Sequence, residues 1–295
     1  FPDRVAQLRG ERGSFRLAGG GGARMARTDR LANTPLLAVA ALEMKDAARI
    51  RLAAPLALDS LPDHVAARLT ESVELGFDPE LGAVIARRRR RLGALVLSDR
   101  TEPADPEEAA SALAGVIGAD PGKLPWTEAA RQLQARVALM RGIEPGIWPD
   151  LSDAALGADL VWLRPHLYGL TRLADVAKLD LSAILHGLIS RALTTRLERE
   201  LPTHLTLPGG RAAIDYTEPV PIAAARAQAF YGMDGTPALA GGRVPLRLAL
   251  LSPAGRPAAI TADLARFWTS AWAEVRKEMR GRYPKHNWPE NGARP

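Results

Sequence analysis

A run of five consecutive arginines, Arg87 to Arg91, is the feature of the sequence that points most directly to a chemistry. Planar guanidinium groups donate hydrogen bonds to phosphate oxygens, so this run could follow a nucleic-acid backbone. On a strand, three of the arginines would lie on one face and two on the other. Two other interpretations stay open: a solvated edge strand that resists aggregation, and a surface that docks against acidic neighbouring domains.

A second basic segment lies near the C-terminus. Residues 276–289 hold five positive charges and one negative charge, with a tyrosine and a tryptophan among them. This mixture is typical of surfaces that combine phosphate contacts with base stacking, and it makes Arg280, Arg282 and Lys285 further candidates for nucleic-acid binding. The alternative is a tail that packs back on the last helix, with an arginine stacked on Trp288.

Motifs for catalysis are lacking in the sequence. The nearest approach to an ATP-binding phosphate loop is Gly118 to Lys123, but Ile117 stands in place of its first glycine and Leu124 in place of the hydroxyl that would hold Mg²⁺. A turn at the end of a helix is the better interpretation. Gly19 to Gly22 predicts a hairpin turn, and no serine lies in a Gly-x-Ser-x-Gly motif. We therefore expect no catalytic, cofactor-binding or metal site in this chain.

Composition narrows the class of protein further. The 295 residues are 47% hydrophobic with a formal net charge of +6, and there are no cysteines. Disulfides, thiolate nucleophiles and cysteine-ligated zinc are therefore excluded, and the five histidines are too scattered for a metal motif. The positive charge suits a partner made of phosphates, although a GC-rich genome would favour arginine codons as well.

The chain also lacks signals for a membrane or for secretion. No stretch of about 18 apolar residues is present, and no signal peptide opens the sequence. The first residue is Phe1, so we expect a fragment of a longer, cytoplasmic protein.

The pattern of hydrophobic residues predicts strands first and helices afterwards. From Ser14 to about Arg100, short alternating segments with Gly and Pro turns predict a small closed barrel or sandwich. Asp105 is then expected to cap one helix and Thr127 a second, with a third beginning near Ser152.

The second half mixes both element types. We expect a long helix over 180–199, a hairpin around 208–210, a short helix over 221–230, a strand over 244–251 and a last helix from Thr261 to Gly281.

Several motifs, in the same order along the chain, resemble the bacterial HrpB family, a branch of the DEAH-related helicases. The motifs that carry the resemblance are Phe15–Ala18, Arg49–Leu56, Arg91–Leu97, Leu124–Trp126, Trp148–Asp153, Pro202–Leu205, Ile214–Tyr216, Leu250–Pro257 and Arg280–Pro289. The chain departs from the family pattern at Gly209, where the family has Ser, and at Arg226–Ala229, where it has Arg-Leu-Gln-Glu.

The resemblance implies an α+β multidomain fold. It consists of a small OB-like (oligonucleotide-binding-like) β-barrel over residues 1–103, a helical connector over 104–164 and an α+β C-terminal domain over 165–295. The first ten or so residues would end a preceding helical bundle.

The resemblance also implies a function for the whole protein. Two RecA-like motor domains that lie outside this chain would bind ATP and Mg²⁺, and the parent helicase would move along single-stranded RNA. This chain, without an active site, would bind single-stranded RNA and its own motor domains as part of the strand channel. The alternative is an interaction module that docks a protein partner and does not bind RNA.

Overall fold

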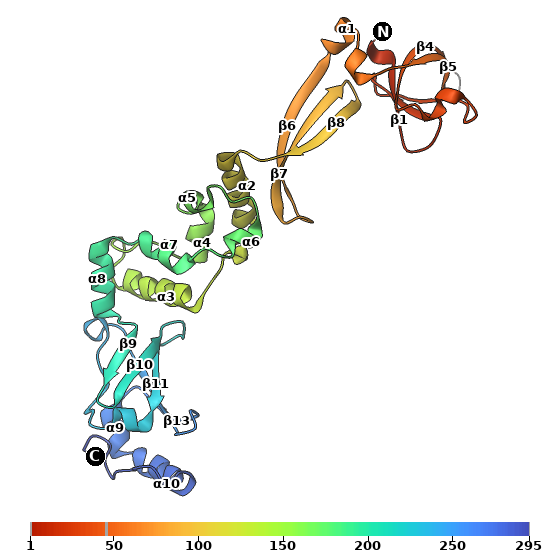
Figure 1. Cartoon of the computed structure of the whole chain (residues 1–295). Coiled ribbons are helices and arrows are strands. Elements are labelled where there is room, and N and C mark those ends of the chain that lie inside the picture. Colours follow the sequence, from red (N-terminus) through yellow and green to blue (C-terminus); the bar gives the residue numbers. More distant parts are fainter. Residues whose placement is uncertain (1, 45–46, 295) are drawn as a thin grey trace. The chain divides into compact units, whose positions relative to one another are not determined.

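The computed structural model describes residues 2–44 and 47–294. The chain divides into two units, residues 1–116 with 167–175, and residues 117–166 with 176–295 (Figure 1). Within the described residues, the helices are too short or too polar to cross a membrane.

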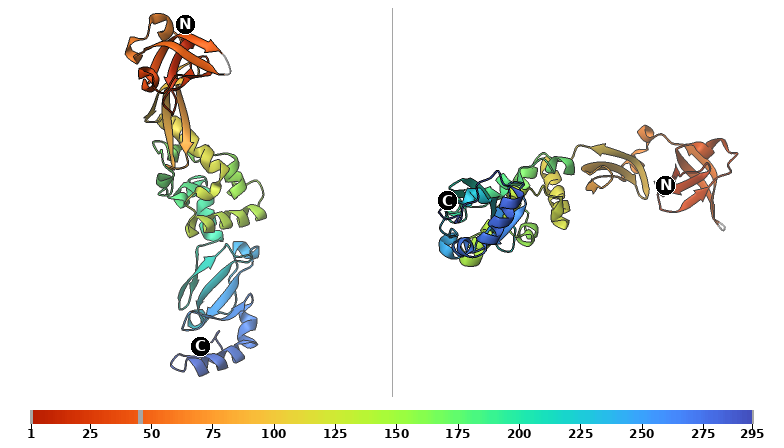
Figure 2. Two further views of the ribbon diagram at one scale, coloured as in Figure 1. Left: turned by 90° about the vertical axis from the view of Figure 1, so that its right-hand side faces the viewer. Right: turned by 90° about the horizontal axis from the view of Figure 1, so that it is seen from below.

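A closed five-stranded barrel opens the first unit. Its strands are β1 (Val5–Leu8), β2 (Ser14–Leu17), β3 (Gly22–Arg24), β4 (Leu36–Met44) and β5 (Ala48–Pro55). They pair in the order β1-β2-β3-β5-β4, and β4 closes the ring by pairing with β1. The barrel can be followed in both views of Figure 2. Every other side chain points inward, and Phe15, Leu37 and Ile50 are part of the resulting core.

The barrel differs from the expected one at both of its ends. Residues 5–8 form strand β1 and do not end a helical bundle, because their backbone pairs with both β2 and β4. The barrel strands end at Pro55, well before residue 103. Beyond Pro55, Pro62 occupies the N-cap position of a single turn of helix. This turn is α1 (Asp63–Ala66).

The predicted strands beyond the barrel form a second sheet of the first unit. It consists of β6 (Leu69–Asp78), β7 (Ala83–Leu92) and β8 (Leu95–Glu102), all antiparallel, with β7 in the middle. A small core at its base joins it to the barrel, and this core includes Val5, Leu92 and Leu95. The arginine run therefore lies on this sheet and not on the barrel.

Helices follow, as predicted, after residue 104. They are α2 (Pro106–Ala119), α3 (Glu128–Ile143), α4 (Asp153–Ala158), α5 (Arg164–Leu167), α6 (Leu173–Val176), α7 (Leu181–Gly187) and α8 (Arg191–Glu200). The three predicted caps are confirmed. The side chain of Asp105 accepts hydrogen bonds from the amides that begin α2, and Thr127 and Ser152 do the same for α3 and α4.

The prediction of one long helix over 180–199 is wrong. Segment 180–199 forms two helices, α7 and α8, because the chain turns after Gly187 and Ser190 caps the second helix through a hydrogen bond from the amide of Leu193. The apolar stripe continues through both helices, and for this reason the periodicity alone did not reveal the break.

The second unit also contains a five-stranded sheet. Its strands are β9 (His204–Leu207), β10 (Gly210–Asp215), β11 (Ile222–Arg226), β12 (Arg247–Leu251) and β13 (Pro257–Thr261), in the order β13-β12-β11-β10-β9. The predicted hairpin is confirmed as β9–β10. The predicted helix over 221–230 is wrong, since Ile222 to Arg226 pair with β12 as a parallel strand. Pairing with distant strands overrides the weak local preference of an alanine-rich segment.

Two helices and a folded tail end the chain (Figure 1). They are α9 (Leu264–Thr269) and α10 (Trp272–Arg282). The expected single helix is therefore broken near Ser270, and the residue that caps α9 is Asp263 and not Thr261. The tail beyond α10 folds back on its first residue: the indole of Trp272 donates a hydrogen bond to the carbonyl of Pro289 at 3.0 Å, and Trp288 is buried against Trp272.

Candidate nucleic-acid interface

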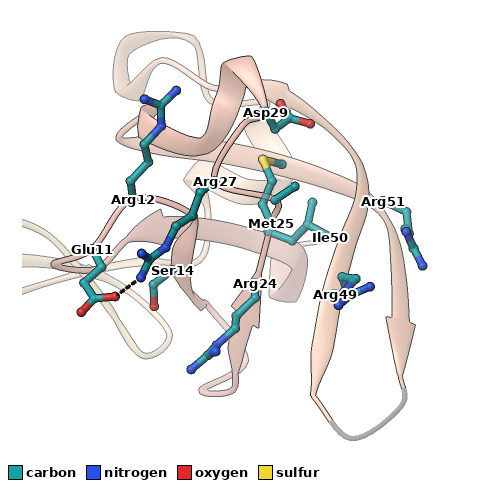
Figure 3. Close-up of a pocket in the computed structure, with 12 residues that line it drawn as sticks. Glu11, Arg12, Ser14, Arg24, Met25, Arg27, Asp29, Arg49, Ile50 and Arg51 are labelled. Atoms are coloured by element: carbon teal, nitrogen blue, oxygen red, sulfur yellow. Dashed lines mark hydrogen bonds and ion pairs between the residues drawn. The ribbon is translucent and has the colours of Figure 1, made fainter.

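An arginine-rich cavity of about 510 Å³ lies on the barrel (Figure 3). It is formed by the loop between β1 and β2, by β3 with the residues that follow it, and by the start of β5. Five arginines and two carboxylates are among the side chains that line it, namely Arg12, Arg24, Arg27, Arg49, Arg51, Glu11 and Asp29. In five-stranded barrels of the oligonucleotide-binding kind, the first loop, the loop before the last strand and the face of strands two and three bind nucleic acid. The cavity occupies this part of the barrel.

Strand pairing brings these distant arginines together. Strands β3 and β5 are parallel neighbours in which Arg24 lies opposite Arg49. Ile50 points into the barrel core, so Arg49 and Arg51 on either side of it point outward. Figure 3 shows Arg24 and Arg49 on adjacent strands beside the cavity. Their guanidinium groups can therefore approach one ligand.

The turn that presents Arg12 depends on Gly13. Its φ of +81° lies in the left-handed region, and a β-carbon there would lie 2.6 Å from the carbonyl oxygen of Met25. The amide of Met25 donates to the carbonyl of Gly13 at 2.9 Å, which holds the loop against the segment after β3. A side chain at position 13 would force the two segments apart.

Three of the five cavity arginines make no ion pair among the described residues, so they are available to a ligand. Arg27 pairs with Glu11 at 2.7 Å, and Arg51 pairs with Glu43. Within residues 2–44 and 47–294, Arg12, Arg24 and Arg49 make no ion pair, and all three are exposed. Clustered, unpaired guanidinium groups raise the local positive potential and bind phosphate oxygens well.

The arginine run is arranged differently, because most of its charges are paired within the sheet. Strand β7 is the central strand, so the edge-strand interpretation of the run is wrong. Arg88 donates to Glu71 at 2.6 Å and to Glu102 at 2.7 Å, and Arg89 pairs with Glu74 and Asp99. The hydrogen bond from Arg88 also lowers the pKa of Glu71. These cross-strand pairs support the sheet.

The two faces of β7 are not equivalent. On one face, all three arginines make ion pairs. Arg87 pairs with Asp78 at 3.8 Å, and both Arg89 and Arg91 pair with Glu74, Arg91 at 3.3 Å. On the opposite face, Arg90 makes no ion pair among the described residues, and neither does Arg100 on β8, which lies opposite Arg88. Phosphate binding by the run stays a prediction, and Arg90 is its most available member.

The tail places its candidates on the surface. Arg280, Arg282 and Lys285 are all exposed, and Arg282 pairs with Glu278 at 3.2 Å. Trp288 is buried and its indole donates to the carbonyl of Tyr283 at 2.9 Å, so it cannot stack on a base. The tail packs back on α10, as the alternative held, although Arg276 bonds to the carbonyl of Trp288 and does not stack on its ring.

The interpretation of the sequence missed Arg12, Arg24 and Arg49 as site residues. They come from three segments that meet only when the barrel closes. The available signal was the alternation Arg49-Ile50-Arg51, which places two arginines on one outward face. The segment resembling a phosphate loop is a turn in which Lys123 pairs with Asp120. Within the described residues, no group of acidic residues and histidines could hold a metal ion.

Comparison with known proteins places these features in a family. The family model of the ATP-dependent helicase C-terminal region, HrpB_C, matches residues 162–292, and that of the ATP-dependent RNA helicase HrpB connector region matches residues 68–101. The chain is 39% identical over 302 residues to the ATP-dependent RNA helicase HrpB of Escherichia coli (strain K12), covering 99% of this chain. The chain therefore belongs to the HrpB family.

Solved structures agree with this assignment. The chain is similar to a crystal structure of the E. coli DExH-box NTPase HrpB, with a TM-score of 0.63, 37% identity and coverage of 100% of this chain and 38% of that one. A crystal structure of the Escherichia coli DEAH/RHA helicase HrpB matches with a TM-score of 0.56, 34% identity and coverage of 98% and 37%. The matched connector region coincides with the β6–β8 sheet. The chain spans 37% of the length of its curated relative.

Proposed function

We propose that this chain is a nucleic-acid-binding accessory region of an ATP-dependent RNA helicase that acts in the cytoplasm. In this proposal, single-stranded RNA crosses the barrel cavity, and Arg12, Arg24 and Arg49 contact successive phosphates. RecA-like motor domains outside this chain bind ATP and Mg²⁺ and form the rest of the strand channel. The observation that supports the proposal most is the convergence of three unpaired arginines on the oligonucleotide-binding side of the barrel.

The electrostatics of the cavity define the expected behaviour. Each phosphate contact releases condensed counterions, so the affinity falls as salt rises, with a slope of about −0.7 per contact for a single strand. Three contacts predict that the cavity contributes about −2 to the slope of log affinity against log salt. The arginines contact the backbone and not the bases, and little preference for sequence is expected.

The experiment is fluorescence anisotropy with labelled oligouridine, at low and at physiological salt. The chain with R12Q, R24Q and R49Q is compared with a control that loses the same charge elsewhere, R191Q, R211Q and R256Q, since these three arginines are exposed and do not line the cavity. We expect the cavity variant to lose at least about tenfold in affinity and about 2 in slope. The control should lose less than about threefold.

Two results would count against the proposal. An equal loss in both variants would mean that RNA responds only to total charge. Unchanged binding in the cavity variant would place the RNA on another surface, such as Arg90 and Arg100 of the β6–β8 sheet, which we call the connector sheet because the connector family model matches it.

A further inference from the structure

A second large cavity, of about 650 Å³, lies in the second unit and plays no part in the proposed RNA site. Helices α3, α7 and α8 and strands β9, β10 and β11 line it, and we call it the C-terminal cavity. All of its lining residues belong to one compact unit of the chain. The elements that form it are therefore held in place by a common core.

Small side chains leave the space open. Ala129 on α3, Ala213 on β10 and Ala224 on β11 are exposed within the lining. Behind them, Leu133 and Tyr216 are buried, so the floor is apolar and continuous with the core. Concave apolar surfaces with a few placed polar groups are the usual form of binding pockets.

Among the described residues that line the C-terminal cavity, Arg136 is the one arginine, and its guanidinium group already has partners. The side chain of Arg136 is 3% exposed and pairs with Glu198 at 2.7 Å. It also donates to the carbonyl of Leu201 at 2.7 Å. A buried guanidinium held by a carboxylate and backbone carbonyls has little capacity to bind a further anion.

Carboxylates dominate the remaining charge of the lining. Glu128, Glu198 and Asp215 lie around the cavity, and only Glu198 has a cation as partner in this set. Gln132 donates one hydrogen bond to Glu128 at 2.8 Å and another to Asp215 at 2.6 Å. The barrel cavity, with five arginines and two carboxylates, has the opposite charge. Two cavities of opposite sign on one chain indicate two chemically different ligands.

We propose that the C-terminal cavity docks a short segment of a protein partner, in which an aliphatic side chain is flanked by lysine or arginine. The aliphatic side chain fills the space above Leu133 and Ala224, and the basic side chains approach Glu128 and Asp215. RNA is disfavoured here, because its phosphates would face Glu128 and Asp215, while Arg136, the arginine among the described lining residues, is already paired with Glu198. Aliphatic anchors in concave pockets carry much of the binding energy of such contacts, and charge complementarity selects the partner.

The probes for a test are two synthetic peptides, Ac-Lys-Leu-Lys-Leu-Lys-NH₂ and Ac-Glu-Leu-Glu-Leu-Glu-NH₂, and unlabelled oligouridine. Each is titrated into the ¹⁵N-labelled chain, and amide chemical shifts are followed. A129L fills the cavity from an exposed helical position, and A192L makes the same change on α8, outside the lining. E128Q removes one carboxylate of the lining, and E107Q removes a first-turn glutamate of α2 as its control.

We expect the lysine peptide to shift amides of α3, β10 and β11, and the glutamate peptide to leave them unchanged. A129L should weaken the lysine peptide at least about tenfold and E128Q about threefold, while A192L and E107Q should change it less than about twofold. Equal binding of both peptides, or a lysine peptide indifferent to A129L, would overturn the proposal. So would oligouridine that shifts the same amides and is blocked by A129L, because the occupant would then be RNA.

Discussion

Gly93 lies against the backbone of Ala18, so closely that a β-carbon on Gly93 would overlap the carbonyl oxygen of Ala18. The next amide, of Ala94, donates to that same carbonyl at 2.9 Å. Ala18 follows barrel strand β2, and Gly93 lies in the turn between β7 and β8. This contact joins the barrel to the connector sheet, and it requires a residue without a side chain.

The substitution G93A should therefore destabilise the first unit. Gly93 has a φ of +55°, and an alanine there would be strained as well as overlapping. We expect a loss of about 2–4 kcal/mol in the free energy of unfolding, measured by the exchange of β7 and β8 amides. G82A is the control, since Gly82 has a similar φ of +58° but open space around it, and it should cost only about 1 kcal/mol. Equal losses would mean that the contact with Ala18 is unimportant.

We expect the arginines of the run to have two different roles, some stabilising the sheet and others contacting RNA. R88Q should lower the melting temperature of the first unit, because Glu71 and Glu102 both lose their partner. R90Q combined with R100Q should leave the melting temperature unchanged, since neither arginine makes an ion pair within the described residues. If the run contacts RNA, this double variant should also reduce oligouridine affinity by about three- to tenfold, with a shallower salt slope. A double variant that binds RNA like the parent would remove the run from the interface.

Acid should destabilise the second unit through Glu144. Arg196 donates a hydrogen bond to this carboxylate, with further ones from Arg243 and Trp148, and together they lower its pKa from 4.5 to about 2. A lowered folded-state pKa means that the stabilisation is complete above pH 4.5 and is lost as the pH falls through 2. E144Q should therefore unfold at lower temperature than the parent above pH 4.5, and the difference should shrink between pH 4.5 and 2.

Tryptophan fluorescence is suited to this measurement, because all six tryptophans lie in the second unit. E274Q is the matched control, since Glu274 is exposed and makes no ion pair among the described residues. A difference between E144Q and the parent that stays constant down to pH 2 would mean that another group controls the acid response.

Local signals in the sequence predicted local structure well. The caps at Asp105, Thr127 and Ser152 depend on side chains that bond to amides two or three residues away, and all three are present. The hairpin around Pro208 to Gly210 is confirmed for the same reason. The strand β11 was mistaken for a helix because its pairing partner β12 lies about twenty residues further along the chain.

The candidate site was harder to predict, since charge density in the sequence is not charge density on the surface. The longest run of arginines is largely neutralised by carboxylates on the neighbouring strands. Arg12, Arg24 and Arg49 are single arginines or part of short alternating segments, and they become a cluster only through the parallel pairing of β3 with β5. Strand order, which sequence reasoning did not supply, decides both outcomes.

The ion pairs of the connector sheet also solve a problem of alignment. The five identical side chains Arg87 to Arg91 cannot by themselves define the register of β7 with its neighbouring strands. The carboxylates of the neighbouring strands help to define this register, because three of them pair with the odd-numbered arginines and two pair with an even-numbered one, Arg88. If the neighbouring strands shifted by one residue, their carboxylates would move to the opposite face. The face with three arginines would then hold two carboxylates, and the face with two arginines would hold three. The acidic residues of β6 and β8 thus favour the observed register of β7 over one that is shifted by a single residue.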